Sequence, residues 1–174
     1  MEYFLIQQDK RYIHAPIILN LFNRIDRRHI SKDSSTNIPR ISVLYIKSNK
    51  NTQFIDLLDR QLFLLSDELK KLVEKYEPYL KFKIMQLIDA ENSKTAQYHL
   101  PILDTIDCLS EKSELNRDKS IIKRAVLEEK KIEDKSIFKI GGVSSTYVAI
   151  RLDLAESILR RAFSGINLTR VEVE

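Results

Sequence analysis

The chain has 174 residues, of which 43% are hydrophobic and 31% are charged, and its 29 basic and 25 acidic residues give a formal net charge of +4. This length suits one domain that buries a core without metals, and the single cysteine, Cys108, excludes an internal disulfide framework. No apolar stretch approaches the ~20 residues that span a bilayer, and the first residues lack the pattern of a signal peptide. We therefore expect a cytoplasmic protein with no membrane contact. We also expect a single domain over residues 1–174, in which residues 1–40 form a looser N-terminal portion.

Short runs rich in β-branched and aromatic residues indicate strands along most of the chain. The segment 17–25 has apolar residues at helical spacing but is short, so either structure remains open, and the polar segment 29–39 predicts a loop. The pair Gly141-Gly142 predicts a hairpin turn. The expected strands cover residues 3–6, 41–46, 63–65, 82–88, 98–106, 121–127, 137–140, 147–150 and 166–173.

Two segments carry the signals of capped helices. In the first, Ser66 can cap a helix whose apolar stripe begins at Leu69. In the second, Asp153 and Glu156 have the spacing of a capping box, and Gly165 is placed to supply a left-handed C-terminal turn. We therefore expect helices at about 67–77 and 154–163 that pack on a single mixed or mostly antiparallel sheet, which is the α+β class.

The histidines, the cysteine, the glycines and the serines of this chain are not spaced as in known metal-binding or catalytic motifs. His14, His29 and His99 have no partner at metal-ligand spacing, so surface or loop histidines are the better interpretation. Cys108 lies between apolar neighbours and is interpreted as a small buried hydrophobe. The chain has neither a phosphate-binding glycine loop nor the G-x-S-x-G elbow of serine hydrolases. We expect no catalytic residue, no cofactor and no metal.

A basic cluster extends from Arg24 to Arg40 and includes Arg27 and Arg28. One interpretation is a phosphate-contacting patch, which would make the protein a nucleic-acid-associated regulator that uses residues 24–40. A solvated loop is the favoured interpretation, because the cluster has few aromatic residues on which bases could stack.

An acidic cluster, which consists of Asp104, Asp107, Glu111 and Glu114, follows in the second half of the chain. Paired carboxylates can act as acid and base, and with a distant histidine they would define an enzyme; they can also hold a divalent cation. No local geometry favours either role over an exposed polar loop, so the alternatives stay open.

The segment 106–114, which reads IDCLSEKSE, is the centre of a resemblance to a known family. Together with FLLSDE at 63–68, IFKI at 137–140 and SGINL at 164–168, in this order and spacing, it resembles immunity-protein family eleven of bacterial polymorphic toxin systems. The resemblance covers roughly residues 40–174. Membership would imply an α+β cytoplasmic protein that neutralises a neighbouring toxin by binding it, without catalysis. The family's Asp-and-Ser-rich segment corresponds here to Asp107, Ser110, Glu111 and Ser113.

The leading hypothesis is therefore a protein that masks a cognate toxin, with no nucleic acid expected as a partner. Because interface hot spots favour aromatic residues and arginine, the candidate anchors are Tyr12, Arg27, Arg28 and Tyr45, together with the acidic cluster. Nuclease toxins tend to be basic, and a basic inhibitor gains no long-range attraction to them. The net charge of +4 therefore argues mildly against a nuclease as the target.

Overall fold

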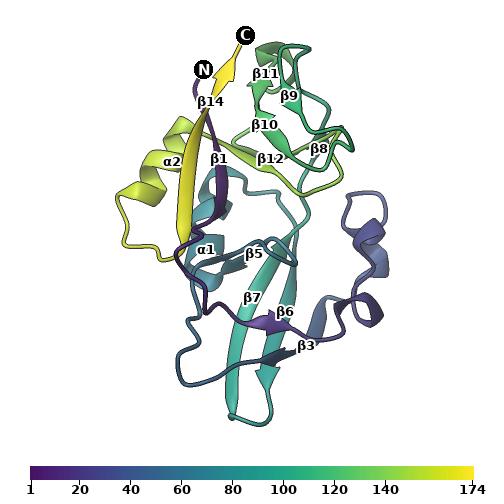
Figure 1. Cartoon of the computed structure of the whole chain (residues 1–174), viewed down its shortest axis with the longest axis vertical. Coiled ribbons are helices and arrows are strands. Elements are labelled where there is room, and N and C mark those ends of the chain that lie inside the picture. Colours follow the sequence, from purple (N-terminus) through teal and green to yellow (C-terminus); the bar gives the residue numbers. More distant parts are fainter. The chain divides into compact units, whose positions relative to one another are not determined.

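The computed structural model describes residues 1–174 and shows a mostly β protein with fourteen strands in three sheets and two α-helices (Figure 1). The prediction of a single sheet covered by two main helices is wrong. The expected apolar runs do form strands, but they divide between two six-stranded sheets, each curled into a half-barrel. Alternation along a strand shows which side is buried, whereas it does not show which strands pair, and the pairing decided the architecture.

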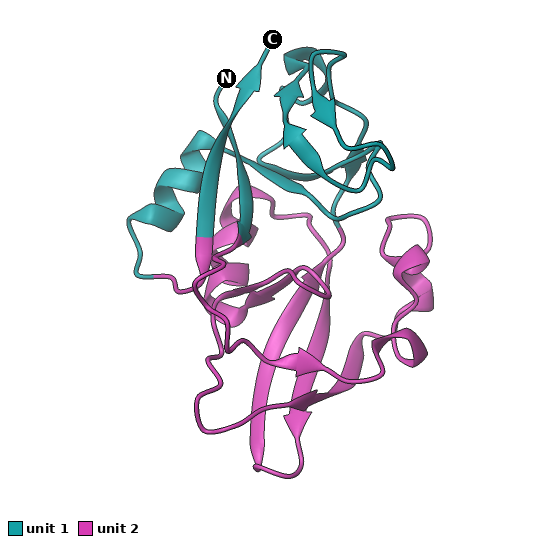
Figure 2. Cartoon of the chain, in the orientation of Figure 1, with its two compact units in different colours: residues 1–7, 103–162, 167–174 teal, residues 8–102, 163–166 magenta.

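The chain forms two compact units (Figure 2). Unit 1 consists of residues 1–7, 103–162 and 167–174, and unit 2 consists of residues 8–102 and 163–166. Each unit has its own cluster of buried apolar side chains.

The larger sheet of unit 1 has the strand order β11-β14-β1-β13-β12-β8. Strand β13 pairs antiparallel with both β1 and β12, so the predicted hairpin between 137–140 and 147–150 is confirmed. Tyr3 is fully buried in the core, where its ring lies edge-on to Phe138 and its hydroxyl donates to the Ile132 carbonyl at 2.7 Å. The strands of unit 1 are β1 (Tyr3–Gln8), β8 (Thr105–Ile106), β11 (Val126–Leu127), β12 (Ile137–Ile140), β13 (Val148–Arg151) and β14 (Ile166–Val173), with a separate pair β9 (Glu114–Leu115) and β10 (Ile122–Arg124).

The sheet of unit 2 has the strand order β2-β3-β6-β7-β5-β4. Its centre is the long hairpin of β6 and β7 (Figure 1). Strand β3 pairs in parallel with β6, along the edge of β6 that does not face β7. The strands are β2 (Ile17–Ile18), β3 (Ile41–Lys47), β4 (Leu57–Leu58), β5 (Leu64–Ser66), β6 (Phe82–Asp89) and β7 (Lys94–Pro101).

A side chain joins β2, one end strand of this half-barrel, to the turn that follows β4, the other end strand. The Ile18 amide donates to Gln61 Oε1 at 2.7 Å, and Gln61 Nε2 donates to the Ile18 carbonyl at 2.9 Å. The amide group of Gln61 thus occupies the place of a neighbouring strand and satisfies both backbone groups of Ile18. This contact links β2 to the turn between β4 and β5.

The two α-helices are α1 (Asp67–Tyr76) and α2 (Leu152–Leu159), and neither is long and apolar enough to cross a membrane. The cap of α1 is confirmed, because the Leu69 amide donates to the Ser66 hydroxyl at 3.2 Å. The capping box at Asp153 is wrong. Helix α2 begins earlier, at Leu152, and Asp153 accepts a hydrogen bond from Arg151 at 2.7 Å. Four short 3-10 helices complete the fold, namely η1 (Leu21–Asn23), η2 (Arg27–His29), η3 (Ser35–Asn37) and η4 (Glu129–Lys131).

Gly165 has the predicted left-handed backbone, with φ of 74°, but it precedes β14 and does not end α2, whose C-cap is Arg160. A Cβ atom at Gly165 would lie 2.5 Å from Ile55 Cδ1. The neighbouring Ser164 amide donates to Asp56 Oδ2 at 2.7 Å, which holds this turn in place. Position 165 therefore requires glycine for two reasons, namely its left-handed backbone and the lack of room for a Cβ atom next to Ile55.

We expect Gly165→Ala to lower the free energy of unfolding by about 2–4 kcal/mol, because left-handed strain adds to overpacking against Ile55. The matched control is Gly142→Ala, which has the same φ of 74° but meets only the movable Asp107 carboxylate, at 3.1 Å. The control should lose only about 1–2 kcal/mol, from conformation alone. Urea denaturation measures both values, and equal losses would contradict the steric argument.

Candidate binding surface

Strand β3 has apolar side chains on both of its faces. Leu44 and Ile46 point into the core of unit 2 and are buried. The alternate residues Ile41, Val43 and Tyr45 point outward and are 57%, 39% and 44% exposed. Three successive outward-pointing side chains of one strand are thus apolar and exposed. This is unusual, because the side chains on the solvent-exposed face of a sheet are normally polar.

The neighbouring strands extend this apolar surface. The parallel register places Ile84 of β6 beside Ile41 and Ile88 beside Tyr45, with the polar Gln86 between them beside Val43. Ile84 and Ile88 are both half-buried. Ile17 of β2 and the adjoining Leu19 lie on the other side of β3 and are exposed. The helix of this unit, α1, packs mainly on β5 and β7. We call the resulting surface the β3 face, which consists of Ile17, Leu19, Ile41, Val43, Tyr45, Ile84 and Ile88.

Basic residues lie beside the β3 face and at the end of β3, where Lys47 follows Ile46. The guanidinium of Arg24 lies 5.3 Å from the centre of the Tyr45 ring, a distance suited to a cation–π contact. Between Lys10 and Lys50 the chain has nine Lys or Arg residues and two acidic residues, Asp26 and Asp33. Arg28 holds the Asp26 carboxylate at 2.7 Å, and this hydrogen bond lowers the pKa of Asp26 to about 2. The segment that includes β2 and β3 is therefore strongly positive.

The end of β3 is held by the carboxylate of Asp89, at the tip of the β6–β7 hairpin. Asp89 Oδ2 accepts hydrogen bonds from the Ser48 amide at 3.0 Å and from Asn92 Nδ2 at 2.8 Å, and it is also bonded to the Ser48 hydroxyl. Oδ1 accepts from the amides of Glu91 and Asn92. The hydrogen bond from Ser48, followed by those from Asn92, holds the pKa of Asp89 well below its ordinary value. Asp89 thereby fixes the position of β3 against the hairpin.

Of the predicted basic and aromatic anchors, only Tyr45 lies in the β3 face. Tyr12 is half-buried and packs against the core of unit 2. Arg27 donates to the Gln61 carbonyl, and Arg28 is bound to Asp26. Both arginines therefore have structural partners, although each remains exposed.

The four carboxylates of the acidic cluster all belong to unit 1, each in a different local setting. Asp104 forms an ion pair with Lys135 at 2.8 Å. Asp107 is exposed beside the turn at Gly141 and Gly142. Glu111 is exposed in a turn, and Glu114 lies in β9 opposite Arg124 of β10. No group of three or more His, Cys, Asp and Glu side chains in residues 1–174 is arranged to hold a metal ion.

His99 was expected at the surface, but β7 places it beneath α1, where it is 4% exposed. Its Nε2 lies 3.1 Å from Asp67 Oδ1, and burial lowers its pKa against the opposing effect of Asp67. Cys108 is buried as expected, and its burial raises the pKa of the thiol to about 11. The thiol is therefore protonated at neutral pH.

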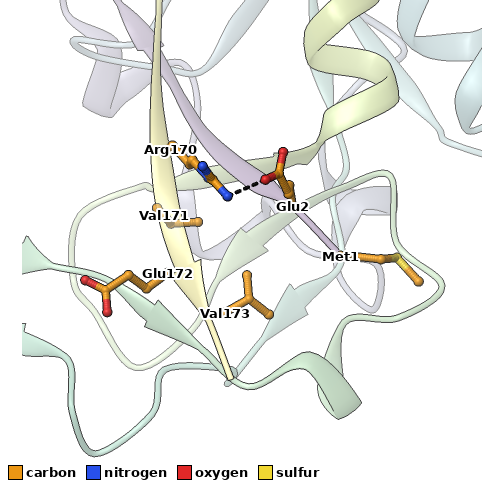
Figure 3. Close-up of a pocket in the computed structure, with 6 residues that line it drawn as sticks. All are labelled: Met1, Glu2, Arg170, Val171, Glu172 and Val173. Atoms are coloured by element: carbon orange, nitrogen blue, oxygen red, sulfur yellow. Dashed lines mark hydrogen bonds and ion pairs between the residues drawn. The ribbon is translucent and has the colours of Figure 1, made fainter.

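Unit 1 has a pocket of about 480 Å³ between its N-terminal residues and β14, lined by Met1, Glu2, Arg170, Val171, Glu172 and Val173. Arg170 and Glu2 turn toward each other and form an ion pair across it (Figure 3). Glu172 is bound by Arg124 at 2.6 Å. The charged groups of this pocket are thus bound to one another and to neighbouring side chains.

No protein-family model matches this chain, and a search of curated proteins found no match to it either.

Sequence reasoning identified β3 as a strand but did not identify its outer side as a candidate surface. The signal was present, because residues 41–46 are apolar at nearly every position and only Ser42 interrupts the run. Such a run is typical of a strand that is buried on both faces. Only the structure shows that one of these faces is uncovered.

We expect the stability of the protein to fall in acid partly through Asp89. Because folding lowers the pKa of Asp89, its contribution is complete above the ordinary carboxyl value of about 4 and is lost as the pH falls through the lowered value. Asp89→Asn should be less stable than the parent at neutral pH and should lose less stability between about pH 5 and pH 2. Urea midpoints across this range measure the effect, and parallel profiles would contradict it.

Proposed function

We propose that this protein is an immunity protein of a bacterial polymorphic toxin system, which acts in the cytoplasm by binding and masking a cognate toxin without catalysis. The observation that carries the proposal is the β3 face, an exposed apolar surface with the guanidinium of Arg24 beside it. A cluster of exposed apolar side chains of this kind typically marks a site of protein–protein contact. The resemblance of segments such as 63–68 and 106–114 to immunity-protein family eleven supports the same function.

The composition of the β3 face favours a protein as the partner. Six of its seven side chains are aliphatic and offer no ring for a base to stack on. Its aromatic residue, Tyr45, already has a guanidinium over its ring. The buried centre of an interface is more apolar than its rim, and tyrosine and arginine are frequent among its hot spots. A standard complex buries about 800 Å² per partner.

The charge around the face favours an acidic toxin surface. The nine basic residues between Lys10 and Lys50 would attract an acidic partner and repel a basic one. This agrees with the net charge of +4, which argues mildly against a basic nuclease as the target. The association rate should therefore fall as ionic strength rises.

A nucleic-acid-associated regulator is the alternative, and the basic surplus of the segment that includes residues 24–40 is the observation in its favour. It requires retention on heparin or DNA columns with a steep dependence on salt. Arg27 and Arg28 each have a partner within the protein, which makes them poorer phosphate ligands. No retention at low salt would remove this alternative.

We expect Val43→Glu to weaken toxin neutralisation, because the substitution places a negative charge opposite an acidic partner and removes an apolar contact. The protein is expressed together with the product of the gene next to its own, and growth rescue and co-purification are scored. The affinity should fall at least about tenfold, which corresponds to about 1.4 kcal/mol.

The matched control is Leu159→Glu, which changes another exposed aliphatic residue, 72% exposed in α2 of unit 1, in the same way. It should neutralise the toxin as the parent does, and both variants should keep the parent's unfolding midpoint within the usual range for surface substitutions. Equal loss in both variants would contradict the assignment of the β3 face. Rescue by a variant that cannot bind the toxin would contradict masking itself.

A further inference from the structure

Half of β3 forms an open edge of its sheet. Its backbone bonds to β6 through alternate residues, beginning at Arg40, whose carbonyl accepts from the Ile84 amide at 2.9 Å. Arg40, Ser42 and Leu44 bond to β6 in this way. The alternate residues Ile41, Val43 and Tyr45 therefore direct their N–H and C=O groups to the opposite edge of β3. At that edge the Tyr45 carbonyl accepts from the Leu19 amide at 2.8 Å.

Strand β2 covers this edge only near the end of β3. Its register pairs Ile17 with Lys47 and Ile18 with Ile46, and no strand pairs with Ile41 or Val43 on that side. The reason is local, since Asn20 adopts a left-handed backbone with φ of 51° and turns the chain away into η1. Ile41 and Val43 are left with their edge N–H and C=O groups outside any ladder.

Natural proteins usually protect an open edge with lysine, proline or an inward charge. Within Ile41–Leu44 there is none of these, and the outward side chains are a valine and an isoleucine. The edge and the β3 face meet at the same two residues. An unprotected edge beside an apolar face has the geometry of sites that accept an extended segment as an added strand.

Resting on the proposed function, we infer that the toxin docks an extended, acidic segment as an additional strand along Ile41–Leu44. The charge around the edge selects this occupant: Arg40 precedes the open residues, Lys47 ends the strand, and Arg24 lies over Tyr45. Apolar residues on one face of the added strand would extend the β3 face, and acidic residues would meet the basic groups. A second copy of this chain would bring an equally basic edge, so like charge disfavours it.

Amide hydrogen exchange followed by NMR tests this inference on the purified protein. The probe is the hexapeptide Glu-Val-Glu-Val-Glu-Val, blocked at both ends, and the control is the corresponding Lys-Val peptide. The amides of Ile41 and Val43 should exchange about tenfold more slowly at a peptide concentration ten times the dissociation constant. The amides of Ser42 and Leu44 bond to β6 already and should change little, which gives an internal control on the same strand.

A backbone variant provides a second measurement. Val43→Pro removes the edge N–H without removing a bond to β6, and proline is tolerated on edge strands. It should lose binding of the Glu-Val peptide at least tenfold, whereas Val43→Thr, which keeps the N–H, should bind within about threefold of the parent. Circular dichroism and the exchange of the β6 and β7 amides verify that the sheet is intact.

Several outcomes would overturn strand addition. They are unchanged exchange at Ile41 and Val43 with the Glu-Val peptide, equal slowing with the Lys-Val peptide, or slowing that depends on protein concentration alone, which would indicate self-association. Slowing by a short DNA duplex in place of the peptide would indicate a polyanion partner. Neutralisation of the toxin by Val43→Pro together with its loss in Val43→Glu would leave the proposed function standing while removing strand addition.

Discussion

The parallel pairing of β3 with β6 is the constraint on which the candidate surface depends. This register joins residues that are 43 positions apart in the sequence, from Ile41 opposite Ile84 to Tyr45 opposite Ile88. It directs Leu44 into the core, and because side chains alternate along a strand it must direct Val43 outward. A shift of one residue would exchange the two faces, so the buried leucine and the exposed valine are consequences of the same register.

The elements around β3 show why its outer face and its edge are both uncovered. At the edge of β2 that no strand pairs with, Gln61 bonds both backbone groups of Ile18. Asp89 anchors Ser48 and so restrains the far end of β3. Nothing comparable acts on the outer side, since α1 packs on β5 and β7 and β2 is only two residues long. The apolar face and the open edge are therefore on a strand that is held firmly in place, which limits the entropy lost when a partner binds.

Some predictions from local sequence succeeded because the physics they use is local. The Ser66 cap of α1 involves residues three positions apart, and the hairpin around Gly142 needs only a positive φ. The prediction of the capping box at Asp153 failed because a competing local partner, Arg151, binds that carboxylate. His99 was placed wrongly because its burial depends on α1, which covers it from more than twenty positions away in the sequence.

The sequence by itself determined most of the strands, the two helical segments, the buried character of Cys108 and the excess of positive charge between Lys10 and Lys50. Those properties follow from side-chain periodicity and composition, which are readable without knowing what lies opposite. Only the tertiary structure decided that the strands divide between two six-stranded sheets, and that one face and half of one edge of β3 have no neighbour. Whether a strand is covered depends on segments distant in the chain, and the free energy of that long-range pairing is not encoded in any local pattern.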